Sequence, residues 1–277
     1  MTVVAHVTDL HLVEYDHHKR AGAAKSRLLY LNTGRKIDPK ARFDRVCEAL
    51  RRASRSDHLV ITGDLTEDGT DAQFELLAAA LAEANVDPEH VTLVPGNHDL
   101  YADHCAFARA LRGPLHAYAK TSTLGQPVEL AGAVVVPVST AMAHRLWFSA
   151  GTLTVDMAGT LDGLARDPAL RDRPLLVAQH HPPLGHGQGL WNWIDGTRAP
   201  ERGARLLHAH AHMHVLHGHT HTRKSYRVRL DGPEQVHSGA AVLSSSEHVR
   251  FYDTAHGELR ALDATSSAPV AVRLVLS

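Results

Sequence analysis

Residues 91–99 read VTLVPGNHD, a short aliphatic and β-branched run that ends in a glycine, an asparagine, a histidine and an aspartate. The run Val91–Val94 predicts a strand, and Gly96 lets the backbone turn sharply directly after it. Residues 59–64 repeat this plan, because they read LVITGD. In an open α/β sheet, ligands bind beyond the carboxyl ends of the strands. Both stretches therefore predict polar side chains at such an edge.

The same arrangement recurs after three further predicted strands. Side chains two positions apart in an extended segment lie on one face, so both can reach the same ion. Nitrogen and oxygen donors without thiolates suit manganese, iron, zinc, nickel or cobalt. The sequence therefore predicts a metal site at the sheet edge. The additional polar residues are Asp9 and His11 after Val3–Val7, His180 and His181 after Leu175–Ala178, and His219 and His221 after 215–216.

Helical patterns alternate with strands over the first two-thirds of the chain, and the last third is mostly β. We expect one α/β domain over residues 1–277, with two packed sheets covered by helices. Residues 1–222 carry the motifs, and the β-rich part 223–277 either completes the second sheet or helps the protein to dimerise. The predicted helices are 41–54, 71–84, 104–112, 155–166 and 200–211, and the last strands form a predicted meander at 223–230, 235–237, 249–252, 259–262 and 270–276.

Composition indicates an ordinary globular protein. Of 277 residues, 44% are hydrophobic and 21% charged, and the net charge of −1 disfavours nucleic acid as a partner. We expect neither a secretory signal at residues 1–12 nor a membrane-spanning apolar run. Cys47 and Cys105 are expected to be buried free thiols, which favours the cytoplasm. The 23 histidines are unusually many.

Five blocks of this sequence together resemble the signature of the calcineurin-like metallophosphoesterase superfamily, and they span residues 9 to 221. The resemblance implies an α/β fold, a four-layer αββα sandwich of two mixed β-sheets flanked by helices. In style, the blocks are most similar to bacterial cyclic-nucleotide and glycerophosphodiester phosphodiesterases. The blocks are Asp9-x-His11, Gly63-Asp64, Gly96-Asn97-His98-Asp99, His180, and Gly218-His219-x-His221.

The resemblance also implies roles for single residues and two metal ions, manganese, iron or zinc. Asp64 would bridge the two ions. The water that they share, activated to hydroxide, would attack phosphorus in line. His98 would stabilise or protonate the leaving group, and Asp99 would orient His98. The implied ligands are Asp9, His11, Asp64 and His221 for one ion, and Asp64, Asn97, His180 and His219 for the other; the candidate substrate contacts are Asn97, His98, His181, Trp191 and Trp193.

The expected function is that of a dinuclear metal-dependent phosphodiesterase acting on a small-molecule phosphate ester. A phosphomonoesterase and a nucleotide-sugar lipid pyrophosphatase are alternatives that the motifs leave open. A non-catalytic scaffold of the same fold is disfavoured, because all seven ligand positions are filled. A homo-oligomer is also left open.

Four further features have two interpretations each. The basic stretch 17–45 is either a cap that grips an anionic substrate or a lipid surface, or an exposed helix and loop. The histidines of 208–214 are either a metal-loading tract or solvent-facing positions. His181 is either a structural residue or a substrate contact, and Trp191 and Trp193 either cover the substrate or anchor their loop.

Overall fold

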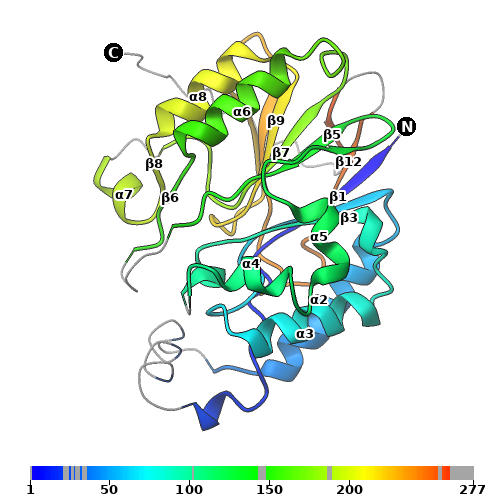
Figure 1. Ribbon diagram of the computed structural model, residues 1–277, viewed down its shortest axis with the longest axis vertical. Coiled ribbons are helices and arrows are strands. Elements are labelled where there is room, and N and C mark those ends of the chain that lie inside the picture. The colour runs from blue at the N-terminus through cyan, green and yellow to red at the C-terminus, as the bar shows by residue number, and fades with distance from the viewer. Residues whose placement is uncertain are drawn as a thin grey trace.

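Two mixed β-sheets pack face to face in the computed structural model, and helices cover the outer face of each sheet (Figure 1). Helices α2 (Pro39–Ala53) and α3 (Asp71–Glu83) lie on one side of the sheets, and α6 (Val155–Arg166) and α8 (Pro200–Ala209) lie on the other. The predicted four-layer αββα sandwich is confirmed. The structure describes residues 2–20, 25, 28, 32, 36–101, 103–142, 148–185, 189–254 and 258–262.

The first sheet has the strand order β13-β12-β1-β2-β3. Strand β1 (Val3–Val7) is parallel to β2 (His58–Thr62), and β2 is parallel to β3 (Val91–Val94). Strand β12 (Arg250–Asp253) runs antiparallel beside β1, and β13 (Arg260–Ala261) pairs with β12. Because β1, β2 and β3 are parallel, their carboxyl ends meet at one edge of this sheet.

The second sheet has the order β10-β11-β9-β7-β5-β4, with parallel central strands and an antiparallel strand at each edge. A separate two-stranded pair, β6 with β8, lies outside both large sheets. The bounds are β4 (Val128–Glu129), β5 (Val134–Pro137), β6 (Gly151–Thr152), β7 (Leu175–Ala178), β8 (Thr197–Arg198), β9 (Met213–His217), β10 (Lys224–Arg227) and β11 (Glu234–Ser238).

Both faces of the central strands are buried, which explains their continuous aliphatic runs. In β2, Leu59 and Ile61 pack with the helices α2 and α3, whereas Val60 belongs to the core between the two sheets. In β7, Leu175 belongs to the core beneath the helices of the second sheet, whereas Leu176 belongs to the core between the two sheets. The alternation of successive side chains therefore builds three apolar layers between the four layers of backbone.

Polar side chains cap the three longest helices. The Asp38 carboxylate accepts the Ala41 N–H at the start of α2, Thr70 accepts the Gln73 N–H at the start of α3, and Thr154 accepts the Met157 N–H at the start of α6. Such caps satisfy amide groups that the helix itself leaves without partners. The shorter helices are α4 (Ala106–Ala110), α5 (Ala119–Ser122) and α7 (Gly189–Ile194), with 3-10 turns at His17–Lys19, Pro88–His90, His98–Leu100 and His116–Tyr118.

The predicted C-terminal meander is wrong. Strands β10 and β11 join the second sheet, where β11 pairs in parallel with β9, whereas β12 and β13 join the first sheet beside β1. The segment therefore forms two antiparallel pairs in different sheets rather than one meander. The predicted strand at 270–276 lies outside the described residues.

Several histidines occupy the layer between the sheets rather than the surface. His6, His58 and His237 are each at most 1% exposed. The expectation of solvent-facing positions is wrong for His214, which is also buried, because β9 already begins at Met213 and directs His214 into the interior. The same expectation holds for His208, which is exposed on α8.

Among the helices of the described residues, none combines the length and the apolar character needed to cross a bilayer. Both cysteines are free thiols. Cys47 is buried, as expected, but Cys105 is exposed, so the expectation of two buried thiols is wrong for Cys105. Cys105 lies directly before the short helix α4, outside the apolar cores.

The buried His58 predicts a pH dependence of stability. Burial lowers the pKa of His58 from 6.5 to about 4. Between these two pH values the His58 imidazole is protonated in the unfolded chain and neutral in the folded protein. Stability is therefore lost as the pH falls from 6.5 toward 4. For this group alone, we expect a loss of about 2 kcal/mol between pH 7 and pH 5. His58→Gln keeps a polar group near Thr92 Oγ1, which His58 Nε2 contacts at 2.8 Å, and does not titrate.

Urea unfolding of both proteins at pH 7 and pH 5 measures the effect. The variant should lose about 2 kcal/mol less of its unfolding free energy than the wild type over this interval. Equal losses in the two proteins would contradict a depressed pKa at His58.

Candidate metal centre

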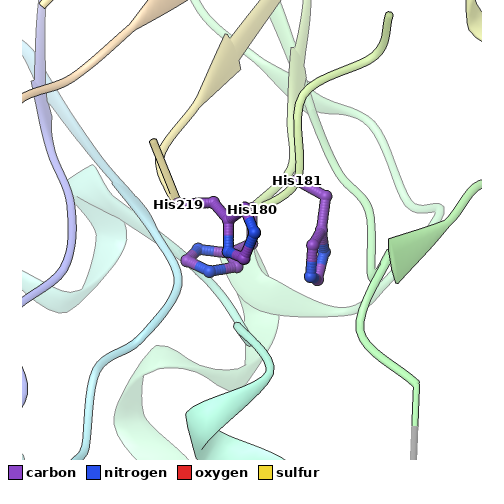
Figure 2. A group of neighbouring side chains, drawn as sticks. All are labelled: His180, His181 and His219. Atoms are coloured by element: carbon purple, nitrogen blue, oxygen red, sulfur yellow. The ribbon is translucent and has the colours of Figure 1, made fainter. Parts of the chain in front are cut away.

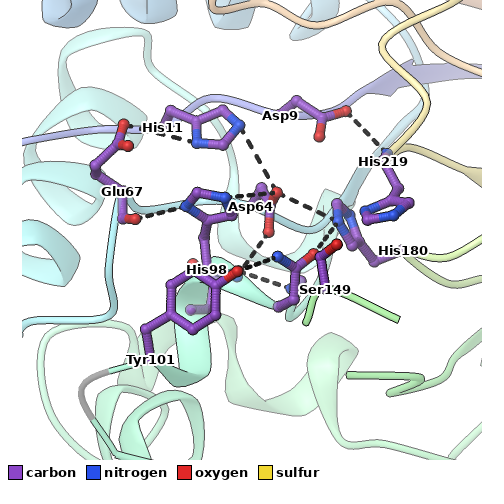
Figure 3. A network of polar contacts seen from close by, with 12 residues as sticks. Asp9, His11, Asp64, Glu67, His98, Tyr101, Ser149, His180 and His219 are labelled. Carbon is purple, nitrogen blue, oxygen red and sulfur yellow. Dashed lines mark hydrogen bonds and ion pairs between the residues drawn. The ribbon is translucent and has the colours of Figure 1, made fainter. Parts of the chain in front are cut away.

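The loops that follow β1, β2, β3, β7 and β9 meet at one place, and they bring side chains from both sheets together (Figure 3). Backbone hydrogen bonds join the first two loops, from Asp9 N–H to Gly63 O at 3.1 Å and from His11 N–H to Asp64 O at 2.9 Å. The two sheets are joined by the His219 N–H, which donates to Asp9 Oδ2 at 3.2 Å. The predicted convergence of these segments is therefore a feature of the fold.

The Asp64 carboxylate lies at the centre of the cluster (Figure 3). Its Oδ2 atom is 3.3 Å from His180 Nε2, 3.7 Å from His11 Nε2 and 4.0 Å from His98 Nε2. Its Oδ1 atom accepts the backbone N–H of His98 at 3.0 Å. Asp64 is only 2% exposed. One carboxylate, from the loop after β2, therefore faces residues from three of the other four loops.

Asp9 is a second buried carboxylate, and it lies beside His11 and His221. Asp9 Oδ1 is 3.3 Å from His221 Nε2, and one ligand atom from each of the three residues lies within 4.8 Å of those of the other two. A second group of the same size joins Asp9, Asp64 and His180. The two carboxylates thus belong to one continuous cluster of donors.

Backbone carbonyls select which imidazole nitrogen faces the cluster. A carbonyl oxygen only accepts, so the ring nitrogen that contacts it carries the proton. His180 Nδ1 donates to Thr62 O at 2.8 Å, which leaves Nε2 toward Asp64. His219 Nε2 donates to Asp195 O at 2.6 Å, which leaves Nδ1 as the acceptor atom.

Asn97 presents its amide oxygen to the same cluster. The amide nitrogen donates to the Tyr101 hydroxyl at 2.9 Å, and Oδ1 lies 3.1 Å from His180 Nε2. Tyr101 therefore orients the amide. No sequence motif includes Tyr101, which follows the 3-10 turn His98–Leu100 and lies four residues after Asn97.

His98 is oriented by Glu67 rather than by Asp99. His98 Nδ1 donates to the Glu67 carbonyl at 2.6 Å, so Nε2 faces Asp64. The Asp99 carboxylate instead accepts Thr66 N–H and Gly96 N–H, both at 2.8 Å, along with the Leu65 N–H and the Thr66 hydroxyl. Asp99 thus joins the loop after β2 to the loop after β3. The expectation that Asp99 orients the His98 ring is wrong, because the Glu67 carbonyl makes that contact.

His181 is packed beside the cluster rather than exposed to it. Figure 2 shows its ring next to those of His180 and His219, and the centroid distance between His181 and His219 is 4.6 Å. Both ring nitrogens have partners, Nδ1 with Thr140 Oγ1 at 2.9 Å and Nε2 with Ser149 O at 2.7 Å. This geometry favours the structural interpretation of His181 over the substrate contact.

Trp191 and Trp193 lie on α7, whose following residue Asp195 contacts His219. Trp191 is 54% exposed and Trp193 is 52% exposed. The Trp193 ring packs against Phe148 and lies under the Arg198 guanidinium. The contacts of Trp193 agree with an anchoring role, and the expected contact of either ring with substrate stays a prediction.

The backbone at the cluster adopts conformations that side chains usually avoid. In the described part of the chain, seven non-glycine residues have a positive φ, and five of them are predicted metal ligands. Left-handed φ values are costly outside glycine, and they persist where the surrounding structure enforces them, most often at functional sites. The five residues are Asp9, His11, Asp64, His219 and His221, with φ between 46° and 67°.

Glycine is required next to the ligands because other chain segments come too close. A Cβ atom on Gly96 would lie 2.2 Å from Asp64 Oδ1, and a Cβ atom on Gly218 would lie 1.9 Å from Thr8 Oγ1 and 2.7 Å from Asp9 Oδ2. Such distances are far below van der Waals contact. The two glycines therefore allow the loops to approach the two carboxylates.

The charges of the cluster shift the pKa values of its members. Burial acts to raise the pKa of Asp64, but the charges of His180 and His98 outweigh it and hold this pKa well below its usual range. For His180, burial is outweighed by Asp64, which raises the pKa to about 9. Burial lowers the pKa of His11 to about 4. Asp64 is therefore a carboxylate and His11 a neutral imidazole at neutral pH.

The donor set fits a pair of cations. Both ring nitrogens of His11 are buried without a hydrogen-bond partner among the described residues, although Glu67 and Asp64 each approach His11 to 3.7 Å. Asp9 Oδ1 is also buried, with His221 Nε2 at 3.3 Å. Buried polar atoms are rarely left unpaired, and carboxylate and imidazole atoms are ligands for divalent cations. A cation bound to His180 would replace its proton, since imidazole ligates only when neutral.

Part of the basic stretch 17–45 contacts residues of the metal cluster through a buried arginine. Arg42 is buried and pairs with Glu67, and its guanidinium also donates to His11 O at 3.1 Å. Arg20 pairs with Glu14 and Asp68. Both arginines thus have carboxylate partners inside the protein. Residues 21–24, 26–27, 29–31 and 33–35 of this stretch lie outside the described residues.

Comparison with known proteins agrees with this geometry. The profile of the family described as calcineurin-like phosphoesterase matches residues 2–223. The crystal structure of TT1561 of Thermus thermophilus matches with a TM-score of 0.55 and 14% identity over 94% of this chain and 97% of that chain. A second solved structure matches with a TM-score of 0.53 and 13% identity over 95% and 99% of the two chains. At these identities the two structures share the fold alone. No curated protein matches the sequence.

The close approach of Gly96 to Asp64 predicts the effect of an added methyl group. Gly96→Ala should displace the Asp64 carboxylate, because the new Cβ would lie 2.2 Å from Oδ1. We expect the Mn²⁺ bound per chain to fall from two equivalents to fewer than one, measured by equilibrium dialysis and elemental analysis.

Gly159→Ala is the matched control. Gly159 lies in α6 with nothing within 4 Å of an added Cβ, so metal content should stay at two equivalents while the helix gains about 0.5–1 kcal/mol. Two bound equivalents in Gly96→Ala would contradict the role of Asp64 as the shared ligand.

Proposed function

The chain belongs to the calcineurin-like phosphoesterase family and is a metal-dependent hydrolase of phosphoric esters, and from this premise we propose that it is a dinuclear phosphodiesterase. Its substrate would be a small-molecule diester. The observation that carries the proposal is the position of the buried Asp64 carboxylate among His11, His98 and His180. A shared carboxylate of this kind lets two cations lie close together without a second full set of acidic residues.

The proposed ligand sets divide the cluster at Asp64. The first ion would take the group around Asp9, and the second would take the group around His180. The His11 ring nitrogens, which lack a hydrogen-bond partner among the described residues, support the first set. The second set is supported by His180 and His219, whose other ring nitrogens donate to backbone carbonyls. The sets are Asp9, His11, Asp64 and His221 for the first ion, and Asp64, Asn97, His180 and His219 for the second.

The proposed reaction is in-line attack of water on phosphorus. When bound, two cations supply Lewis-acid polarisation of the phosphoryl oxygens and lower the pKa of a water toward neutrality. His98 would donate from Nε2 to the departing ester oxygen, because its Nδ1 proton is engaged by Glu67 O. Burial acts to lower the pKa of His98, but Asp64 and Glu67 outweigh it and raise this pKa. The raised pKa favours the protonated ring, which would donate where negative charge develops.

Two different surroundings flank the cluster, and they support a diester over a monoester. A cavity of about 590 Å³ lies beside His221. On the His219 side, Asp195 contacts His219 and directly follows α7, which exposes Trp191 and Trp193. Each of the two ester arms of a diester would thus contact a different side of the cluster, whereas a monoester has only one arm to place.

Other expectations from the sequence stay predictions. They concern manganese, iron or zinc as the native metal, a cytoplasmic location, a homo-oligomer, membrane contact through 17–45, and Asp99 as a catalytic residue. The single domain over 1–277 and the contacts of Trp191 and Trp193 with substrate belong to the same group.

Metal reconstitution tests the proposed function. Protein stripped with EDTA should be inactive, and Mn²⁺ should restore hydrolysis of bis(p-nitrophenyl) phosphate with a higher kcat/KM than that for p-nitrophenyl phosphate. Asn97→Ala and His219→Ala should each lower kcat/KM for the diester by at least about 10³, because each removes a ligand of the second ion. Circular dichroism should report an unchanged fold in both variants.

His208→Ala is the control for the loss of a histidine, since His208 is exposed on α8 away from the cluster. Its activity should equal that of the wild type. Wild-type rates in both ligand variants would refute the proposed metal ligands, and faster hydrolysis of the monoester would refute the diester preference.

A further inference from the structure

A cavity of about 590 Å³ adjoins the metal cluster on its His221 side. The start of α2 and the loop after β11 form its walls. Its volume lies within the range of roughly 300–1,000 Å³ that is usual for small-molecule sites. The residues that matter for its chemistry are Lys36, Asp38, Arg42, Arg45, His221 and Ser244.

The cavity and the metal cluster share a wall. His221 lines the cavity and also lies 3.3 Å from Asp9 Oδ1. Arg42 lines the cavity and donates to the backbone carbonyl of His11 at 3.1 Å. A substrate whose phosphorus lies at the cluster could therefore extend one ester arm directly into the cavity.

The cations of the cavity differ in how far they are neutralised. Arg42 pairs with the buried Glu67 carboxylate. Arg45, in contrast, donates to the Leu243 carbonyl, an uncharged partner, and Lys36 is exposed. Within the part of the chain that the structure describes, neither Lys36 nor Arg45 forms an ion pair. The positive charges of these two side chains thus remain available to a ligand.

Little negative charge opposes them. Among the residues that the structure describes, Asp38 is the one acidic residue that lines the cavity, and it is exposed with one oxygen engaged by the Ala41 N–H as the cap of α2. Ser244 adds a hydroxyl group. The lining therefore carries an excess of positive charge. Lys36 and Arg45 can both bind an anionic oxygen, and Arg45 can present two parallel N–H groups to a phosphate or carboxylate.

The other side of the cluster has a different character. Asp195, which contacts His219, directly follows helix α7, and this helix exposes Leu190, Trp191 and Trp193. An anionic group on the substrate would gain nothing from these apolar surfaces. The two sides of the site thus distinguish the two arms of a diester by charge.

We propose that the cavity lined by Lys36 and Arg45 is a subsite for a second anionic group, a phosphate or carboxylate carried on one arm of the substrate. This inference rests on the proposed phosphodiesterase function. The preferred substrate is thus a diester with an additional charge, and the subsite selects it over diesters with two neutral arms.

Two synthetic diesters that differ in one charge test the subsite. The first is thymidine 5′-(p-nitrophenyl phosphate), and the second carries an additional 3′-phosphate. With the Mn²⁺-loaded protein, kcat/KM should be higher for the second. Lys36→Ala and Arg45→Gln should each lower the ratio of the two kcat/KM values about tenfold, since each removes a charged contact to the 3′-phosphate.

Lys40→Ala is the matched control for the loss of a positive charge nearby. Lys40 is exposed on α2, does not line the cavity and pairs with Asp44. Its ratio should equal that of the wild type. The free product thymidine 3′,5′-bisphosphate should also bind more weakly to Lys36→Ala and Arg45→Gln in calorimetry, independently of turnover.

The outcomes separate the two proposals. Hydrolysis of both diesters with the same ratio in the wild type, Lys36→Ala and Arg45→Gln overturns the subsite and leaves the phosphodiesterase standing. Equal loss of the ratio in Lys40→Ala also overturns it, because the effect would then be one of net charge. Hydrolysis of neither diester overturns the phosphodiesterase and the subsite with it.

Discussion

The burial of one carboxylate, Asp64, is the constraint on which the rest of the site depends. A charge enclosed in a protein is costly unless partners compensate it, and Asp64 is 2% exposed. The loops after β1, β3 and β7 supply His11, His98 and His180 around it, and the adjacent Asp9 brings a second negative charge that these side chains must also balance. Two bound cations would complete this balance, which is why folding and metal binding are expected to be coupled.

The sandwich architecture explains how chain segments so far apart reach one point. Parallel strands in each sheet end at the same edge, and the two edges meet where His219 N–H donates to Asp9 Oδ2. The approach requires left-handed backbone at five ligands and glycine at positions such as Gly96. Backbone strain is therefore concentrated at the cluster, and the three apolar cores of the sandwich hold the loops in these conformations.

Much of the site could be predicted from the sequence because each ligand block follows a recognisable strand. What could not be predicted are contacts made through the backbone: the carbonyls of Thr62, Glu67 and Asp195 orient three imidazoles, and no side-chain pattern reports a carbonyl. Pairings between distant segments were missed for the same reason, as with Arg42 and Glu67. The fold was predicted well where strands alternate with helices, but the last strands divide between two sheets, a choice that local patterning does not encode. The high histidine content also has a second explanation, since His6, His58, His214 and His237 lie between the sheets.

The most direct measurement of the central claim is anomalous X-ray diffraction from crystals of the Mn²⁺-loaded protein, recorded above and below the manganese absorption edge. We expect two anomalous peaks roughly 3.5–4 Å apart, one on each side of the Asp64 carboxylate, with Asp9 and His221 at one peak and Asn97 and His219 at the other. No peak at Asp64 in excess manganese, or a single ion bound away from this carboxylate, would contradict the central claim.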